Sequence, residues 1–265
     1  HPEFAFLPRK FKIAVTGAAE DRAAIGWHDI GLHLKKNAAG EIGVAVLVGG
    51  GMGRTPIIGT LANAFVPWQQ ILVFIEAVVR VYNRYGRRDN AYKARIKILV
   101  KAEGQKFFDA VNAEFKNILE RDTDGAAHMV TQAELDRVSA SFTTPAGVHA
   151  QAEPQKIGDE SVAFTRWQQR NVRAHRLPGY RAVVLSLKRV GQAPGDATDE
   201  QMNAAADLAD RFSHGELRVT HEQNLVLPWV QASELFALWQ AAKASSFATP
   251  NIGLVSDMIA CPGGD

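Results

Sequence analysis

The stretch that decides the fold is EIGVAVLVGGGMG, residues 41–53. Its continuous apolar run, residues 44–48, is typical of a β-strand that is buried on both faces. A glycine run, residues 49–51, follows this strand directly, and backbone without Cβ atoms can approach another group closely. We therefore predict a central strand followed by a tight loop, and Arg54 just beyond the loop favours an anionic group nearby.

The glycine run does not match the familiar nucleotide-binding loops. The pattern G-x-G-x-x-G, counted from the first glycine, requires a glycine at position 54, where Arg54 stands. No Gly-Lys-Ser/Thr sequence follows it either. A purely structural turn therefore remains the alternative to a ligand-binding loop.

Before this strand lies LPRKFKIAV, residues 7–15, which carries two lysines two positions apart. Side chains alternate along a strand, so Lys10 and Lys12 are expected on one face, roughly 7 Å apart at their roots. The other face is expected to enter the core with three apolar residues: Phe11, Ile13 and Val15. The lysine face is either solvated or occupied by an anion, and these residues alone leave both alternatives open.

The pattern of the whole chain predicts an α/β (α+β) fold. In the first part we expect strands over 10–17, 27–35 and 41–53, a helix from Pro67 to about Tyr82, and a helix over 105–119. Residues 121–178 are expected to form a connection with one short helix near 131–139.

The second part predicts the order strand, helix, strand, strand, helix, which is half of a ferredoxin-like unit. The strands are expected over 179–191, around 216–221 and over 224–230. Thr198 and Gln201 form a capping box for the first helix, and Ser233 is expected to cap the second.

Composition excludes several classes of protein. The 265 residues are 46% hydrophobic and 22% charged, as in globular proteins. The net charge of +2 is too small to favour a nucleic-acid partner. The basic stretch 83–97 also lacks the interleaved aromatic residues that base stacking requires, so we expect no nucleic-acid partner.

The most apolar stretch, residues 61–82, contains Pro67, Glu76 and Arg80 and is predicted to be a core helix rather than a membrane span. We therefore expect no membrane partner. A single cysteine, Cys261, excludes an intrachain disulfide framework and favours a reducing, cytoplasmic compartment. With no initiator Met and an abrupt final ACPGGD, the chain is expected to be an internal fragment of a longer protein.

Two motifs concern metals. HEQNL, residues 221–225, begins like a zinc-protease motif but has Leu225 where the second histidine belongs, so we expect no zinc site. Cys261 precedes Pro-Gly-Gly, a loop that exposes a sulfur and suits iron–sulfur ligation. A lone core cysteine is the alternative, and one ligand cannot hold a cluster.

Five motifs occur in one order: LPRKFK, LVGGGMGRTP, NAYKARIK, RVTHEQNLVL and ACPGGD. With them the chain resembles the sirohaem-dependent nitrite and sulfite reductases, such as the sulfite reductase haemoprotein β-component, over nearly its whole length. The resemblance implies a first sirohaem-binding half over 1–120, a connection over 121–178, and a ferredoxin-like half-domain over 179–245. Residues 246–265 would then begin a second sirohaem/4Fe–4S domain.

The resemblance also implies roles for individual residues. Lys10 and Lys12 would lie over the distal face of the sirohaem, offset the charge of the bound anion and donate protons. Cys261 would be a ligand of the 4Fe–4S cluster. The residues implied in sirohaem binding are Arg9, Gly49, Gly50, Gly51, Arg54, Arg95, Lys97, Gln223 and Asn224.

The implied function is part of an assimilatory sulfite reductase that reduces sulfite to sulfide with six electrons. The alternative is a ferredoxin-dependent nitrite reductase that forms ammonia, and a non-catalytic tetrapyrrole- or anion-binding module represents another class. The electron donor would be a flavoprotein reductase subunit or ferredoxin. Three further cluster cysteines and some anion-binding arginines of the family are absent from these 265 residues, so the fragment alone is not expected to catalyse.

Overall fold

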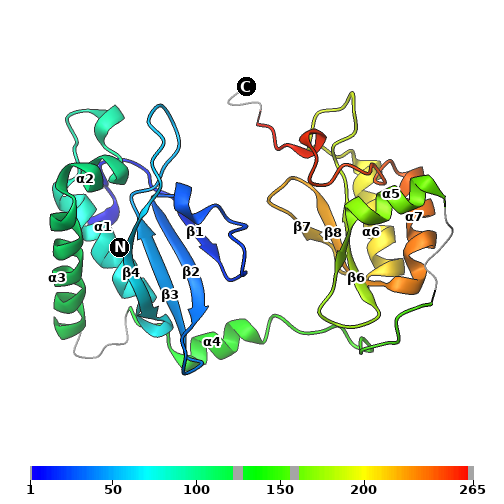
Figure 1. The fold of residues 1–265 in the computed structure, drawn as a ribbon, viewed down its shortest axis with the longest axis horizontal. Helices are drawn as coiled ribbons and strands as arrows, with labels where there is room; N and C mark the ends of the chain where they lie inside the picture. The colour runs from blue at the N-terminus through cyan, green and yellow to red at the C-terminus, as the bar shows by residue number, and fades with distance from the viewer. Residues whose placement is uncertain (1, 122–127, 156–160, 262–265) are drawn as a thin grey trace. The chain divides into compact units, whose positions relative to one another are not determined.

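The computed structural model describes residues 2–121, 128–155 and 161–261. The chain forms two compact units, His1–Thr143 and Thr144–Asp265 (Figure 1). Each unit has its own sheet and its own hydrophobic core.

The first unit contains a four-stranded mixed sheet in the order β1-β2-β3-β4. Its strands are β1 (Ile13–Thr16), β2 (Ile30–Lys36), β3 (Ile42–Val48) and β4 (Thr60–Pro67). β1 pairs with β2 in parallel, and the other two pairs are antiparallel. The predicted α/β class is confirmed, and the apolar run 44–48 lies inside β3 as expected.

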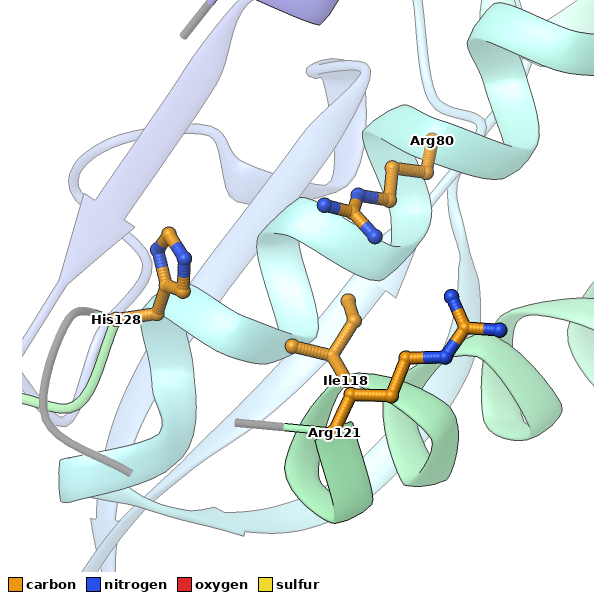
Figure 2. Close-up of a pocket in the computed structure, with 4 residues that line it drawn as sticks. All are labelled: Arg80, Ile118, Arg121 and His128. Carbon is orange, nitrogen blue, oxygen red and sulfur yellow. The ribbon is translucent and has the colours of Figure 1, made fainter. Parts of the chain in front are cut away.

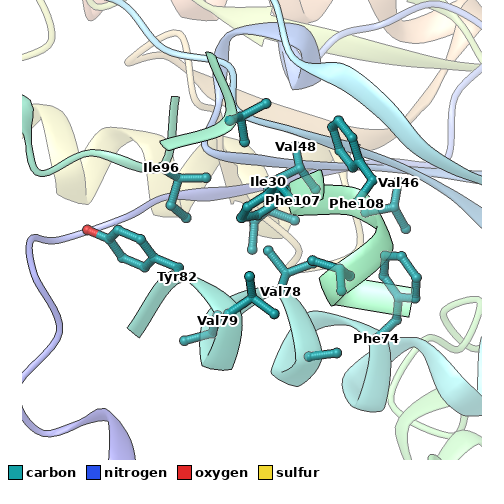
Figure 3. Close-up of a cluster of buried hydrophobic side chains, with 14 of the residues drawn as sticks. Ile30, Val46, Val48, Phe74, Val78, Val79, Tyr82, Ile96, Phe107 and Phe108 are labelled. Carbon is teal, nitrogen blue, oxygen red and sulfur yellow. The ribbon is translucent and has the colours of Figure 1, made fainter. Parts of the chain in front are cut away.

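Three helices share a core with one face of this sheet: α1 (Ile71–Tyr85), α2 (Ile96–Glu103) and α3 (Gln105–Arg121). Figure 3 shows strand residues such as Val46 and Val48 meeting Phe74 and Val78 of α1 and Phe107 of α3. A fourth helix, α4 (Gln132–Ser139), lies where a short helix was predicted and has no buried residue. Among the described helices, none combines the length and the apolar character that crossing a membrane requires.

Of the three predicted core residues, Phe11 packs against the core, but strand β1 itself buries the face opposite to the predicted one. Ala14 and Thr16 are 8% and 5% exposed, whereas Ile13 and Val15 are 42% and 54% exposed. The cause is the 3₁₀ turn Ile25–Trp27, which folds over the first of these faces. Gly31 of β2 pairs with Ala14, and a Cβ on Gly31 would lie only 2.2 Å from the carbonyl oxygen of Ile25 in this turn.

The predicted helix start at Pro67 is wrong. Pro67 is the last residue of β4, where it pairs with Gly43, and the helix begins only at Ile71 after a 3₁₀ turn. Proline has no N–H for the ladder, so it suits the end of a strand as well as the first turn of a helix. Strand β4 and helix α2 were not predicted at all.

The second unit has an antiparallel sheet in the order β5-β6-β8-β7. Its elements are α5 (Val162–Asn171), β5 (Val172–Ala174), β6 (Tyr180–Leu185), α6 (Asp199–Phe212), β7 (Arg218–Val219), β8 (Leu225–Gln231) and α7 (Leu235–Ala244). The sequence from β6 to α7 confirms the predicted order. Helix α5 was missed inside the predicted connection, although Phe164 and Trp167 are both buried at helical spacing.

Of the two predicted helix caps, the structure confirms only the one at Thr198, so the stability effects of the two positions can be compared. Thr198 and Gln201 form the expected capping box on α6. The cap at Ser233 is wrong, because a 3₁₀ turn over Ala232–Glu234 moves the start of α7 to Leu235. Thr198→Ala should lower the free energy of unfolding by about 0.5–2 kcal/mol.

Ser233→Ala is the control and should change the free energy of unfolding by less than about 0.5 kcal/mol. Urea unfolding followed by circular dichroism measures both variants. Equal losses in the two variants would contradict the assigned caps.

Candidate functional site

Three motifs of the first unit meet at one buried carboxylate, Asp29, which is 1% exposed and lies just before β2. Asp29 Oδ2 accepts the backbone N–H of Lys12 at 3.1 Å. Arg95 Nη2 donates to both carboxylate oxygens, at 2.9 and 2.8 Å. The carbonyl oxygen of Asp29 accepts the N–H of Gly49 at 2.9 Å. The lysine segment, the glycine loop and the Arg95 segment are thereby held together.

The two predicted substrate lysines are exposed. Lys12 extends the pairing of β1, because its carbonyl oxygen accepts the N–H of Ile30 at 3.1 Å. Within the described parts of the chain, the ammonium groups of Lys10 and Lys12 have no hydrogen-bond or ion-pair partner. Both charges are therefore available to an anion. Arg9 is also exposed, but its guanidinium donates to the carbonyl oxygen of Ala91 at 2.5 Å.

The glycine loop is packed against the protein itself. A Cβ on Gly50 would lie 2.3 Å from the carbonyl oxygen of Gly26, and one on Gly51 would lie 2.8 Å from Arg95 Nη2. Gly51 also exchanges two backbone hydrogen bonds with Ile57, which closes the loop. These glycines therefore have a structural role, because they allow the close packing of the loop. Arg54 lies in the same closed loop and is exposed.

Two predicted cofactor cations are already engaged by protein groups. Lys97 is 6% exposed, and its Nζ donates to the carbonyl oxygens of Met52 and Thr55 at 2.9 and 2.6 Å. Burial, helped by nearby Arg95, lowers the pKa of Lys97 below its usual range. Lys97 holds the glycine loop and Arg95 pairs with Asp29, so a direct contact of either with a cofactor stays a prediction.

A separate charged cluster lines a cavity of about 280 Å³ (Figure 2). Its lining residues are Arg80, Ile118, Arg121 and His128, none of which was predicted in the site. Arg80 pairs with Glu3, Glu76 and Glu114. Burial raises the pKa of Glu114, but bonds from Arg84 and Arg80 outweigh it and hold that pKa below its usual range. The ion pairs of Glu114 with Arg80 and Arg84 join α1 to α3.

In the second unit, Gln223 lies against the segment that carries Cys261. Its side-chain Nε2 donates to the carbonyl oxygen of Ala260 at 2.7 Å, and the N–H of Ala260 donates back to Oε1 at 3.0 Å. Gln223 has a positive φ of 58°, a conformation that costs a non-glycine residue about 1–3 kcal/mol. The exposed Cys261 follows this pair directly.

Asn224 is buried in a polar network and does not face solvent. Its Oδ1 accepts the N–H of Leu187 at 3.1 Å, and its Nδ2 donates to Asp257 Oδ1 at 2.9 Å. Lys188 Nζ lies 2.9 Å from the same oxygen. Burial raises the pKa of Asp257, but the Gly253 N–H, Lys188 and Asn224 together hold it below its usual range.

Sequence reasoning missed Asp29, Lys188 and Asp257. The available signal at Asp29 was a lone acidic residue immediately before a buried apolar run, in WHDIGLHL. At Lys188 the available signal was a lysine that directly follows the apolar stretch VVLSL. Neither signal names a partner, because both partners lie far away in the sequence.

The first unit is thus an α/β unit that presents two unpaired lysines beside a glycine loop, and the second is a ferredoxin-like half-domain. These two units define a protein of the α/β class. Residues 1–119 match the nitrite and sulphite reductase 4Fe-4S domain, and residues 187–245 match the nitrite/sulfite reductase ferredoxin-like half domain. The chain belongs to the nitrite and sulfite reductase family.

Relatives include both kinds of reductase. A sulfite reductase (ferredoxin) of Synechococcus elongatus is 42% identical over 42% of this chain and 19% of its own length. A chloroplastic ferredoxin–nitrite reductase of Arabidopsis thaliana is 26% identical over 99% of this chain and 39% of its own length. The solved structure of the Mycobacterium tuberculosis NirA protein has a TM-score of 0.57 and 25% identity, covering 94% of this chain and 38% of that one. The chain spans about a fifth to two fifths of the length of these proteins.

The family implies sirohaem and a 4Fe–4S cluster as cofactors. The exposed guanidinium of Arg54 fits an acidic tetrapyrrole, whose carboxylates need positive partners. Cys261 is exposed and fits one thiolate ligand of a cluster that needs four. Among the described residues, no group of three or more His, Cys, Asp and Glu side chains is placed to hold a metal ion.

Proposed function

We propose that the whole protein containing this chain reduces sulfite to sulfide with six electrons. The observation that carries the proposal is the pair of exposed, unpaired lysines, Lys10 and Lys12, on a segment fixed by Asp29. When bound, sirohaem would supply the iron at which the anion is reduced, and the cluster would pass on electrons from the external donor.

The two lysines would attract and orient the anion and offset its charge. As each S–O bond breaks, an oxygen would leave as water, and the lysine ammonium groups would provide protons. Arg54 and Arg9 would bind carboxylates of the sirohaem, and Cys261 would hold the cluster.

We propose ferredoxin as the electron donor, because the relatives are named as ferredoxin-dependent enzymes. The domain limits 1–120, 121–178, 179–245 and 246–265 remain part of the proposal, as does the cytoplasmic compartment. A flavoprotein reductase subunit remains the other candidate donor.

The test uses the whole protein with reduced ferredoxin and compares sulfite with nitrite. We expect kcat/KM to be higher for sulfite, with sulfide as the product. A preference for nitrite with ammonia as product would make the enzyme a nitrite reductase. Tetrapyrrole binding without reduction of either anion would support the non-catalytic module instead.

Cys261→Ser should deplete the cluster from the whole protein. A hydroxyl does not replace a thiolate ligand, so iron and acid-labile sulfide per chain should both fall, together with the signal of the reduced cluster. Met258→Leu, an exposed change in the same segment, is the control and should keep the cluster. Full cluster content in Cys261→Ser would make Cys261 an ordinary exposed thiol.

A further inference from the structure

Asp29 joins segments that lie far apart in the sequence, and we propose that its carboxylate is the positioning residue for Lys12. This inference rests on the proposed function, because it assigns Asp29 a role in that same anion site. Asp29 touches neither lysine ammonium in the described structure. It acts through the main chain of Lys12.

The geometry uses both carboxylate oxygens. Oδ1 accepts from Arg95 Nε at 3.2 Å and from Arg95 Nη2 at 2.9 Å. Oδ2 accepts from Arg95 Nη2 at 2.8 Å and from the N–H of Lys12 at 3.1 Å. An ionised carboxylate accepts at both oxygens, whereas a carboxamide accepts at only one. Asn at position 29 would therefore turn an NH₂ group toward either the Lys12 N–H or the Arg95 guanidinium.

The glycine loop is held by a different group, the main-chain carbonyl of Asp29, which accepts the N–H of Gly49. A change of side chain at position 29 does not remove this carbonyl. Substitution at position 29 should consequently remove the bond that the Lys12 N–H donates, while the bond from Ile30 N–H to the Lys12 carbonyl oxygen and the contact to the glycine loop stay in place. This separates positioning of the lysine from a general loss of the fold.

The alternative is that Asp29 serves only to neutralise the positive charge of Arg95. The backbone bond to Lys12 argues against this, because neutralising a guanidinium does not require it. It also places the anchor at the base of the Lys12 side chain, where a small displacement moves the ammonium group. A misplacement of about 1 Å can cost about a hundredfold in rate.

The test is a pair of double-mutant cycles in the whole protein. We expect Asp29→Asn to lower kcat for sulfite by about tenfold to a hundredfold with sirohaem still bound. In a Lys12→Ala background, Asp29→Asn should add less than about a twofold loss, because residues acting through one another are not additive. In a Lys10→Ala background, it should lower kcat by nearly its full factor.

Equal losses in both backgrounds would overturn the inference and leave Asp29 a structural residue. If Lys12→Ala itself leaves kcat unchanged, the proposed role of Lys12 fails and the inference fails with it. The two failures are thus distinguishable.

Amide hydrogen exchange gives a readout that needs no cofactor. In Asp29→Asn, the N–H of Lys12 should lose protection while the N–H of Gly49 keeps it. Unchanged protection of Lys12 would overturn the inference. If Asp29→Asn does not fold, Asp29→Glu keeps the charge, moves the carboxylate by one methylene, and is put through the same cycles and exchange measurement.

Discussion

Lys12→Ala and Lys10→Ala are each expected to lower sulfite turnover by the whole protein about a hundredfold to a thousandfold. Each lysine would stabilise charge that develops in the transition state, and loss of one such preorganised group costs about 2.7–4 kcal/mol. Sirohaem content should stay near that of the unaltered protein, because Arg54 and the glycine loop are untouched. Turnover is measured with an artificial electron donor, so that docking of ferredoxin does not affect the rate.

Lys36→Ala is the matched control. Lys36 is an exposed lysine at the end of β2, outside the group of residues around Asp29. Its loss should leave turnover unchanged and alter the free energy of unfolding by no more than about 0.5 kcal/mol. Near-normal rates in both Lys10→Ala and Lys12→Ala would return these lysines to an ordinary solvated surface.

Lys188→Met is expected to lower the free energy of unfolding of the second unit by about 3–5 kcal/mol, because it leaves Asp257 buried without its cation. The Lys188 side chain is buried and its Nζ also donates to the carbonyl oxygens of Glu222 and Asp257. Urea unfolding followed by tryptophan fluorescence measures the loss. Arg189→Met, at the exposed neighbouring position, is the control and should cost less than about 0.5 kcal/mol. Equal stability of the two variants would contradict the role of the pair.

The same pair has a pH dependence with a defined sign. The pKa of Asp257 is held below its usual range in the folded state, where burial acts against the shift and the bonds from Gly253, Lys188 and Asn224 produce it. The ionised carboxylate therefore stabilises the fold above about pH 4, the ordinary pKa of an aspartate. This stability is lost as the pH falls through the lower folded-state pKa. In Lys188→Met, the free energy of unfolding should fall less steeply as the pH is lowered.

Local patterns were enough for the elements whose stability depends on near neighbours. The capping box at Thr198, the continuous apolar run in β3, and the helices predicted over 105–119 and near 131–139 were found because their determinants lie within a few residues of one another. The structure exposes Lys10, Lys12 and Arg54, and their role in a site stays a prediction.

Long-range packing decided the rest. The buried face of β1 depends on a turn that comes later in the chain and covers it. Arg95 meets Asp29 across 66 positions, and Lys97 meets Met52 across 45. Residues so far apart show no periodicity that links them, so the sequence names the charges but not their partners. The sequence thus supplied many of the elements and the two lysines, whereas tertiary structure alone assigned Lys97 to holding the loop, Arg95 to pairing with Asp29, and Asp29 to holding Lys12.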